Sequence, residues 1–336
     1  MNYCGIDLAS QASAVCVVNE QGTIVREQLV KTASEDLREA LAELGQLRCV
    51  VEAAPIAEWV AQRLEELGHE VVVIDPRRAK AVIQTKNKTD KVDARNLAKL
   101  AQTGWYTAVH RKSPAARLQR THLQARQGLV ETAKAQASRI RGLLRAHGIK
   151  VGQVPAGQFV ARVQQLLAHH APALEAILAP LVTIYQQAQQ AAKTLEQTVK
   201  RHAQRDPVCE RLMQVPGVGP LVASTYVATL DDPTRFPRST QGAAYLGLVP
   251  RVYQSGVTAY HGRISKEGDK LLRWLLVEAA NVLLTRTKRS CALKRWGQKL
   301  AKKRGQGKAN VAVARKLAIL LHRLWVTGTS FTPVPS

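Results

Sequence analysis

The chain has 336 residues, of which 49 are Lys or Arg and 25 are Asp or Glu, so its formal net charge is +24. This length accommodates two or three domains, and the charge favours a polyanionic partner, either nucleic acid or an anionic membrane surface. Because no apolar run reaches the roughly 20 residues of a spanning helix and the start, MNYCGIDLAS, has no secretory pattern, we expect a cytoplasmic protein that does not enter the membrane.

Residues 1–106 predict an α/β domain. Three consecutive strands, YCGID, AVCVVN and TIVREQLV, precede alternating helices and strands at 34–44, 49–53, 56–67, 70–75 and 90–102. Ser34 and Thr89 are the expected N-caps of the first and last of these helices. Three strands followed by alternating helices and strands is the order expected of a ribonuclease-H-like sheet.

Residues 107–204 predict a basic helical segment. Apolar residues in its second half alternate steps of four and three, which is the spacing of a coiled-coil seam: Leu174, Leu178, Leu181, Tyr185, Ala188, Ala192, Leu195 and Val199. An upstream helix at 114–147 has an apolar line through Leu118, Ala125, Leu129, Ile140 and Leu144. Between residues 107 and 172 the only acidic residue is Glu131, against eleven Lys and Arg, and this imbalance favours contact with phosphates.

Residues 205–336 predict a third, mostly helical domain. No Asp or Glu occurs from Asn281 to the end. The stretch KRWGQKLAKKRGQGK at 294–308 holds seven basic residues and three glycines, which predicts a nucleic-acid-contacting loop between helices, with the end of a basic helix as the alternative. Lys302, Lys303 and Arg304 are the candidate contacts within it.

Four carboxylates are candidate metal ligands. Asp90 and Asp93 share one face of a helix, although by themselves they are more typical of an ordinary first helical turn. Asp7 follows the apolar CGI of the first strand and Glu52 follows the CVV of the fourth, and these strands are neighbours in a ribonuclease-H-like sheet. A carboxylate there is costly to bury unless it is paired or binds a metal. The four together predict a site for two Mg²⁺ ions acting in an in-line displacement at phosphorus.

Two stretches of the second half suggest contacts with phosphate. LMQVPGVGPLVASTYVATL at 212–230 resembles a helix-hairpin-helix in which the turn amides around Gly217 and Gly219 hold a phosphate, while a plain tight turn fits the residues equally well.

The second stretch places Ser255 in a loop-like region with Arg251, His261, Arg263 and Lys266 nearby. A serine that attacks phosphorus needs such cations, although by composition alone Ser-Gly is more typical of a turn.

Six blocks, in this order, carry a family resemblance: GIDLAS, VVEAAP, KTDKVDARNLAKLA, VPGVGPLVAS, AAYLGLVPRVYQSG and GRISKEGDKLLRWLL. They resemble the DEDD transposases of bacterial insertion sequences, of the family numbered one hundred and ten, which includes the pilin-gene invertases. The resemblance covers nearly the whole chain. The chain departs from the family's usual residues after Glu52, where Ala-Ala-Pro stands, and at Asp269, where asparagine is more usual.

The resemblance implies a RuvC-like nuclease domain, a coiled-coil segment and a transposase domain. It places the family's acids on Asp7, Glu52, Asp90 and Asp93 and its nucleophile on Ser255. It further implies a homo-oligomer, from dimer to tetramer, in which the acids of one protomer meet the serine of another. Cleavage would leave a phosphoserine link to DNA, and a structured bridge RNA would select donor and target DNA by pairing.

Two other functions stay open on the residues. One is a metal-dependent nuclease or resolvase of the RuvC type, with water as the nucleophile and Ser255 uninvolved. The other is a non-catalytic nucleic-acid-binding protein, for which Asp7 and Asp90 would be dispensable. A covalent protein–DNA adduct that disappears in Ser255→Ala would separate the recombinase from both.

Overall fold

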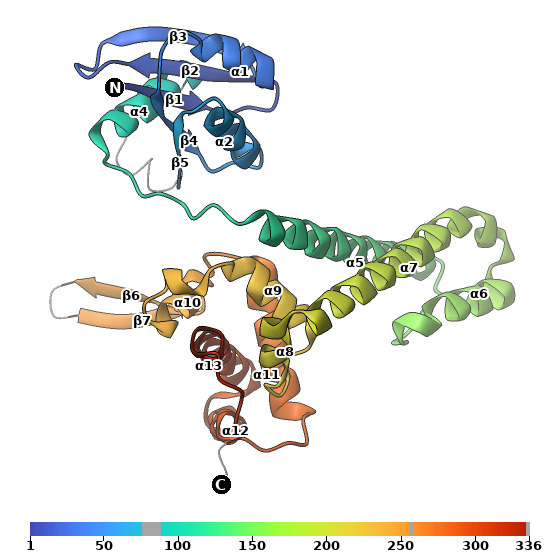
Figure 1. Ribbon diagram of the computed structural model, residues 1–336. Helices are drawn as coiled ribbons and strands as arrows, with labels where there is room; N and C mark the ends of the chain where they lie inside the picture. The colour runs from blue at the N-terminus through green and yellow to red at the C-terminus, as the bar shows by residue number, and fades with distance from the viewer. Residues whose placement is uncertain (76–88, 256–257, 334–336) are drawn as a thin grey trace. The chain divides into compact units, whose positions relative to one another are not determined.

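The computed structural model describes residues 1–75, 89–255 and 258–333 and divides into two compact units, Met1–Lys112 and Ser113–Ser336 (Figure 1). The first unit is α/β and the second is mostly helical, as the sequence predicts. Within the described residues, no helix combines the length and the apolar character needed to cross a bilayer. The further division of the second unit near residue 204 stays a prediction.

The first unit is built on a five-stranded mixed sheet with the order β3-β2-β1-β4-β5. Strands β1, β2 and β3 are antiparallel neighbours, whereas β4 and β5 continue from β1 in parallel. This topology is compatible with a ribonuclease-H-like fold. The strands are β1 (Asn2–Asp7), β2 (Ala12–Val18), β3 (Ile24–Lys31), β4 (Leu47–Glu52) and β5 (Glu70–Ile74).

Helices cover both faces of this sheet. Helices α1 (Ser34–Leu41) and α2 (Ala57–Glu66) pack on one face, in a core that includes Cys4 and Ile6 of β1. Helix α4 (Asp90–Thr103) packs on the other face, against Tyr3 and Val50. The split follows from the pleat, since successive side chains of a strand point to opposite faces.

Gly5 brings α4 unusually close to β1. A Cβ added to Gly5 would lie 2.2 Å from the carbonyl oxygen of Ala94 and 2.2 Å from the amide nitrogen of Ala98. At the other end of the helix, the Gln102 side chain donates to the carbonyl of Glu20 in the β2–β3 turn, at 2.8 Å. That turn lies beside the amino end of β1, so α4 runs antiparallel to β1 and its first turn lies at the carboxyl end of the strand.

The two predicted helix caps have different outcomes. Thr89 is confirmed, because it is the N-cap of α4 and its Oγ1 accepts from the amide of Val92 at 3.3 Å. Ser34 is wrong by one residue: the N-cap of α1 is Ala33, which has the extended backbone (φ −132°, ψ 153°) that a cap requires, and Ser34 is already helical.

The second unit contains a long pair of helices followed by a compact helical bundle. Its helices are α5 (Pro114–Ala146), α6 (Phe159–His170), α7 (Glu175–Arg205), α8 (Pro207–Met213), α9 (Pro220–Leu230), α10 (Ser239–Tyr245), α11 (Lys270–Thr285), α12 (Ala292–Arg304) and α13 (Gln306–Thr327), with short 3₁₀ turns at Ala156–Gln158, Pro172–Leu174 and Pro233–Arg235. One hairpin of β6 (Pro250–Ser255) and β7 (Thr258–Ile264) interrupts the helices.

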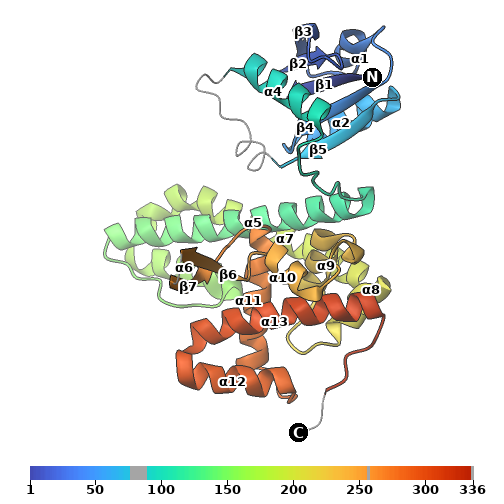
Figure 2. The ribbon, with the colours of Figure 1, turned by 90° about the vertical axis from the view of Figure 1, so that its left-hand side faces the viewer.

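Helices α5 and α7 lie side by side (Figure 2). The predicted α7 seam is largely correct, since Leu178, Tyr185, Ala188, Ala192 and Val199 are buried. The predicted α5 line is wrong at Leu118, which is 75% exposed, and at Ala125, which is exposed. The line is correct at Ile140 and Leu144, which are buried, and the helix also buries Ala116, Leu123, Ala133, Gln136 and Ala137.

Residues 294–308 do not form the predicted loop. They belong to α12 and to the start of α13, with the break at Gly305, so the alternative of a basic helix end is correct. Gly297 does not break α12 but lets it pack closely, because an added Cβ would meet Leu284 and Val313 at 2.6 Å.

Gly5→Ala tests the close packing of α4 on β1. The methyl group would overlap helix backbone that cannot rotate away, so we expect a loss of at least about 2 kcal/mol in the local stability of the first unit. Hydrogen exchange followed by mass spectrometry of peptides from β1 and α4 would measure it. Gly128→Ala, whose Cβ would meet nothing within 4 Å in α5, is the control and should leave β1 and α4 unchanged. Unchanged protection of β1 and α4 in Gly5→Ala would contradict the packing.

Candidate functional site

Asp7 and Glu52 end neighbouring parallel strands. Ile6 pairs with Val51 in the register of β1 and β4, so the two acids follow side by side. Gly5 and Val50, two residues earlier in each strand, face α4. By alternation, Asp7 and Glu52 lie on that same face of the sheet, and both are partly buried.

The first turn of α4 carries the other two predicted acids. Asp93 lies one helical turn before Leu97, which packs with Val50 of β4, and Asp93 is partly buried. Asp90 lies one turn before Ala94, which covers Gly5, and is exposed. Since α4 runs antiparallel to β1, the topology directs both acids toward the edge of the sheet where Asp7 and Glu52 lie.

The described residues do not contain a finished metal site. No three His, Cys, Asp or Glu side chains among them lie close enough together to hold an ion. The chemistry of the four predicted acids nevertheless fits Mg²⁺, which prefers carboxylate oxygens and is commonly held by only one or two carboxylates together with substrate phosphates.

Arg95 fixes α4 to the sheet beside these acids. Its Nε and one terminal nitrogen donate to the two carboxylate oxygens of Glu27 on β3, at 2.5 and 2.7 Å. A two-pronged, charge-assisted pair of this kind specifies orientation as well as adding energy. The hydrogen bond from Arg95 lowers the pKa of Glu27.

Sequence analysis missed one more acid near this edge. Asp75 directly follows β5 and is partly buried, but Ile74, which pairs with Glu52, is the residue on the face covered by α4, so alternation places Asp75 toward the opposite side of the sheet. The signal was present, because an acid after EVVVI repeats the pattern of Asp7 after CGI and Glu52 after CVV.

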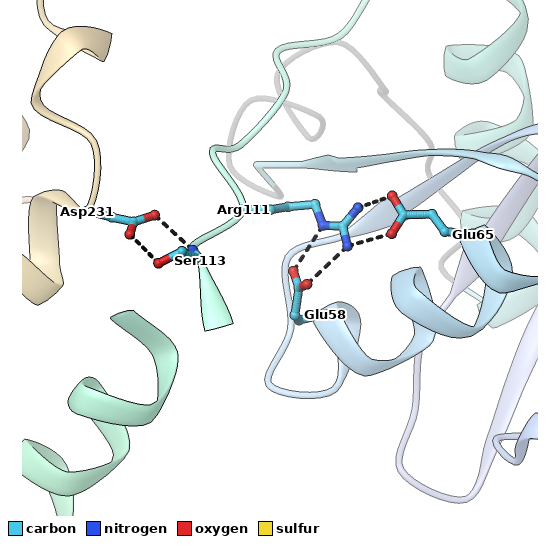
Figure 3. Close-up of polar contacts among 5 residues, drawn as sticks. All are labelled: Glu58, Glu65, Arg111, Ser113 and Asp231. Atoms are coloured by element: carbon cyan, nitrogen blue, oxygen red, sulfur yellow. Dashed lines mark hydrogen bonds and ion pairs between the residues drawn. The ribbon is translucent and has the colours of Figure 1, made fainter. Parts of the chain in front are cut away.

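Arg111, next to the last residue of the first unit, forms an ion-pair network with two glutamates (Figure 3). Its guanidinium donates to both oxygens of Glu58 at 3.0 Å and also binds both oxygens of Glu65, all on α2. Hydrogen bonds from Arg111 to these two carboxylates raise the pKa of the guanidinium. Residues 107–112 are thereby attached to α2, which sequence analysis had not anticipated.

Ser113 begins the second unit and is anchored within it. Its amide and hydroxyl donate to the carboxylate of Asp231 after α9, at 2.9 and 2.6 Å (Figure 3). Its Oγ also caps α5 by accepting from the amide of Ala116.

Ser255 ends β6, opposite Thr258 of β7. The expectation of a loop around it is therefore wrong for its backbone, which belongs to a strand. The side chains of Ser255 and His261 lie outside the described residues. Arg251, which donates to the carbonyl of Ser265 at 3.2 Å, is exposed, as are Arg263 and Lys266.

The root of this hairpin is fixed by backbone contacts and by one ion pair. Gly247 and Gly268 have positive φ angles of 66° and 77°, and an added Cβ would lie 2.2 and 2.1 Å from backbone oxygens of the facing segment. Asp269 then caps α11 by accepting from Leu272, and it also accepts from Arg120 of α5 at 2.9 Å. An aspartate at this position therefore forms an ion pair with Arg120, which an uncharged asparagine could not.

The Pro-Gly-x-Gly turn does join two helices, α8 and α9. Gly217 has a φ of 91°, and an added Cβ would lie 2.5 Å from the carbonyl oxygen of Ala279 in α11, so packing alone requires glycine there. Gly219 is the N-cap of α9 and has open space around it. Phosphate binding at this turn stays a prediction, as do the contacts of Lys302, Lys303 and Arg304, which are exposed in the last turn of α12.

Comparison with known proteins shows the family of the chain. Residues 4–149 match the DEDD transposase family of IS110, and residues 209–296 match the family described as transposase IS116/IS110/IS902. A transposase for insertion sequence element IS1111A from Coxiella burnetii is 31% identical over 326 residues, which cover 95% of this chain and 88% of that protein. A probable family 20 transposase from Pseudomonas aeruginosa is 30% identical, covering 99% of both chains.

The α/β unit, the helical unit and these matches define a DNA transposase, an enzyme of DNA strand transfer whose substrate is DNA. The chain belongs to the IS110 family of DEDD transposases of insertion sequences.

The Arg95–Glu27 pair predicts a pH dependence. Because the folded pKa of Glu27 is lowered, its stabilising contribution is present above the unfolded value of about 4.3 and is lost as the pH falls through the folded value. The difference in stability between the parent and Glu27→Gln, from urea unfolding at a series of pH values, should be constant above about pH 5 and vanish in acid. Glu35→Gln, which removes an exposed pair within α1, is the control. A difference that persists unchanged in acid would contradict the assignment to this pair.

Proposed function

We propose that this transposase cuts and rejoins DNA at a RuvC-like site where Asp7, Glu52, Asp90 and Asp93 hold divalent cations, most suitably two Mg²⁺ ions, and where Ser255 is the nucleophile. The observation that carries the proposal is the antiparallel packing of α4 on β1, which directs the first turn of α4 toward the strand ends of Asp7 and Glu52. Such cations, when bound, would neutralise the scissile phosphate and stabilise the leaving oxygen.

The chemistry is a pair of transesterifications. In the first, the Ser255 hydroxyl attacks phosphorus and loses its proton to solvent, while the bond from phosphorus to one DNA oxygen breaks and that oxygen takes up a proton from solvent, leaving a phosphoserine link and a DNA hydroxyl. In the second, a DNA hydroxyl attacks that phosphorus and the serine oxygen leaves. Each exchange breaks one phosphate ester bond and forms another, so bond energy is conserved. The protein contributes by positioning the reacting groups and stabilising charge. Arg251, Arg263 and Lys266, close to Ser255 in the sequence and exposed, supply the cations for the phosphate.

We further propose that a bridge RNA selects the DNA and that the enzyme acts as a homo-oligomer. The one-sided charge of residues 107–172 and 281–336 supports contact with phosphate backbones along much of the second unit, and such contacts carry no sequence information by themselves. Sequence choice then falls to base pairing. Ser255 belongs to the second unit and the four acids belong to the first. This separation suits an active site in which the serine of one protomer meets the acids of another.

Ser255→Ala tests the nucleophile. We expect the covalent protein–DNA adduct to disappear, because alanine has no oxygen with which to attack phosphorus. The adduct would be trapped by denaturation after incubation with labelled element-end DNA, the guide RNA and Mg²⁺. Ser265→Ala, at the root of the same hairpin, should retain it. Cleavage that survives Ser255→Ala, with no adduct in the parent, would favour the water-using nuclease.

Asp7→Asn and Asp93→Asn test the metal ligands. Each should lower strand cleavage by at least about 100-fold, since even outer-shell partners of a metal cost about 10- to 100-fold. Chelation of the parent should stop cleavage, and added Mg²⁺ should restore it. Asp36→Asn in α1, remote from the strand ends in sequence, is the control for loss of one acid. Full activity in Asp7→Asn and Asp93→Asn would contradict the ligand assignment.

A further inference from the structure

A large groove lies within the second unit, between the β6–β7 hairpin, α12 and α13. Its volume is about 1720 Å³, and Leu248, Ile264, Leu293, Val311, Ile319 and Leu320 form much of its lining. Pockets for small ligands are typically about 300–1,000 Å³. The groove is therefore large enough for a segment of a polymer.

The charge of the groove is of one sign. Six cationic side chains line it, whereas none of its described lining residues is acidic: the cations are Arg263, Lys266, Lys308, Arg315, Lys316 and Arg323. They come from the hairpin, from the residues just after it and from α13, so they surround the apolar lining from more than one side. A polyanion matches this charge.

Aromatic rings stand among these cations. Trp296 of α12 lines the groove, is 37% exposed, and has the Lys316 ammonium 4.4 Å from its ring centroid. Tyr260 of β7 also lines the groove and stacks on Tyr253 of β6, with ring centroids 4.8 Å apart and planes 15° apart. These tyrosines are 58% and 44% exposed. A stacked and solvent-exposed pair presents a flat apolar surface along the hairpin.

We propose that this groove binds an unpaired stretch of nucleic acid, with the phosphates on the six cations and the bases against Trp296, Tyr260 and the apolar lining. Grooves that bind single strands combine a cationic track with aromatic rings on which bases stack. A duplex exposes sugar and phosphate and keeps its base faces stacked inside, so it would leave the apolar lining and the rings uncovered. An acidic peptide could satisfy the charge, but it has no flat rings to match Trp296 and the tyrosine pair.

The inference deepens the proposed function and rests on it for the source of the strand, which is the unpaired DNA that strand exchange exposes. The groove shares Arg263 and Lys266 with the proposed phosphate site beside Ser255, but it contains neither Ser255 nor any of the four acids. Its binding can therefore be measured without metal and without cleavage.

The test is the binding of fluorescein-labelled oligothymidine of about 16 nucleotides to the full-length protein, followed by anisotropy at several salt concentrations in the absence of divalent ions. Trp296→Leu, which keeps an apolar side chain but removes the ring, should weaken binding about tenfold. The double variant Arg315→Gln/Lys316→Gln should reduce the slope of log K against log salt by about 1.4, from two lost phosphate contacts at about 0.7 each. Both variants should bind a duplex of equal length as the parent does.

The matched control is Lys200→Gln/Arg201→Gln, which removes two exposed charges from α7 outside the groove. It should leave oligothymidine binding within about twofold of the parent, and thermal unfolding of each variant would show whether it is folded. Parent-like oligothymidine binding by folded Trp296→Leu would overturn the proposal. So would an equal loss of duplex binding, or a change of oligomeric state with oligothymidine binding intact, which would assign the groove to a second copy of the chain. The binding results do not depend on whether Ser255→Ala loses cleavage. Failure of the proposed nucleophile and failure of the proposed groove can therefore be told apart.

Discussion

The direct contact between α4 and β1 at Gly5 is the constraint on which the candidate active site depends. Without a side chain at Gly5, the backbone of α4 lies against the strand, and the helix has little freedom to slide or rotate. Arg95 on Glu27 and Gln102 on Glu20 then fix its rotation and direction. The first turn of α4, with Asp90 and Asp93, is consequently directed to the edge where β1 and β4 end.

Acids at that edge need a chemical reason in a protein of this charge. The chain carries a net charge of +24 and acts on DNA, so most of its surface attracts phosphate. Carboxylates directed at phosphate would repel it unless cations lie between them, since bound ions reverse the local charge. The same reasoning accounts for where the charged residues lie. The candidate metal ligands are in the first unit, whereas cations surround the hairpin of Ser255 and line the groove of the second unit.

Much of the first unit could be predicted from sequence because its signals are local. Apolar runs ending in Asp7 and Glu52 gave the strands, and Thr89 gave the start of α4. What could not be predicted depends on contacts between distant residues. The buried face of α5 was misassigned at Leu118 because a helix with Ala on several sides does not reveal which side meets α7. Gly297 suggested a loop because its close contact with Leu284 and Val313 is invisible in sequence. Ser255 suggested a turn, and the strand pairing with Thr258 was missed. The ion pairs of Arg111 and Arg120 join residues far apart in the chain and left no local pattern.

Anomalous diffraction from crystals of the protein with DNA and Mn²⁺ tests the central claim most directly, because Mn²⁺ takes the same oxygen ligands as Mg²⁺ and its position can be seen independently of the protein. The account predicts metal peaks about 2.1 Å from carboxylate oxygens of Asp7, Glu52 and Asp93, with Asp90 beside them. Metal bound only elsewhere, or Asp90 and Asp93 remote from the ends of β1 and β4 in the DNA-bound assembly, would contradict it.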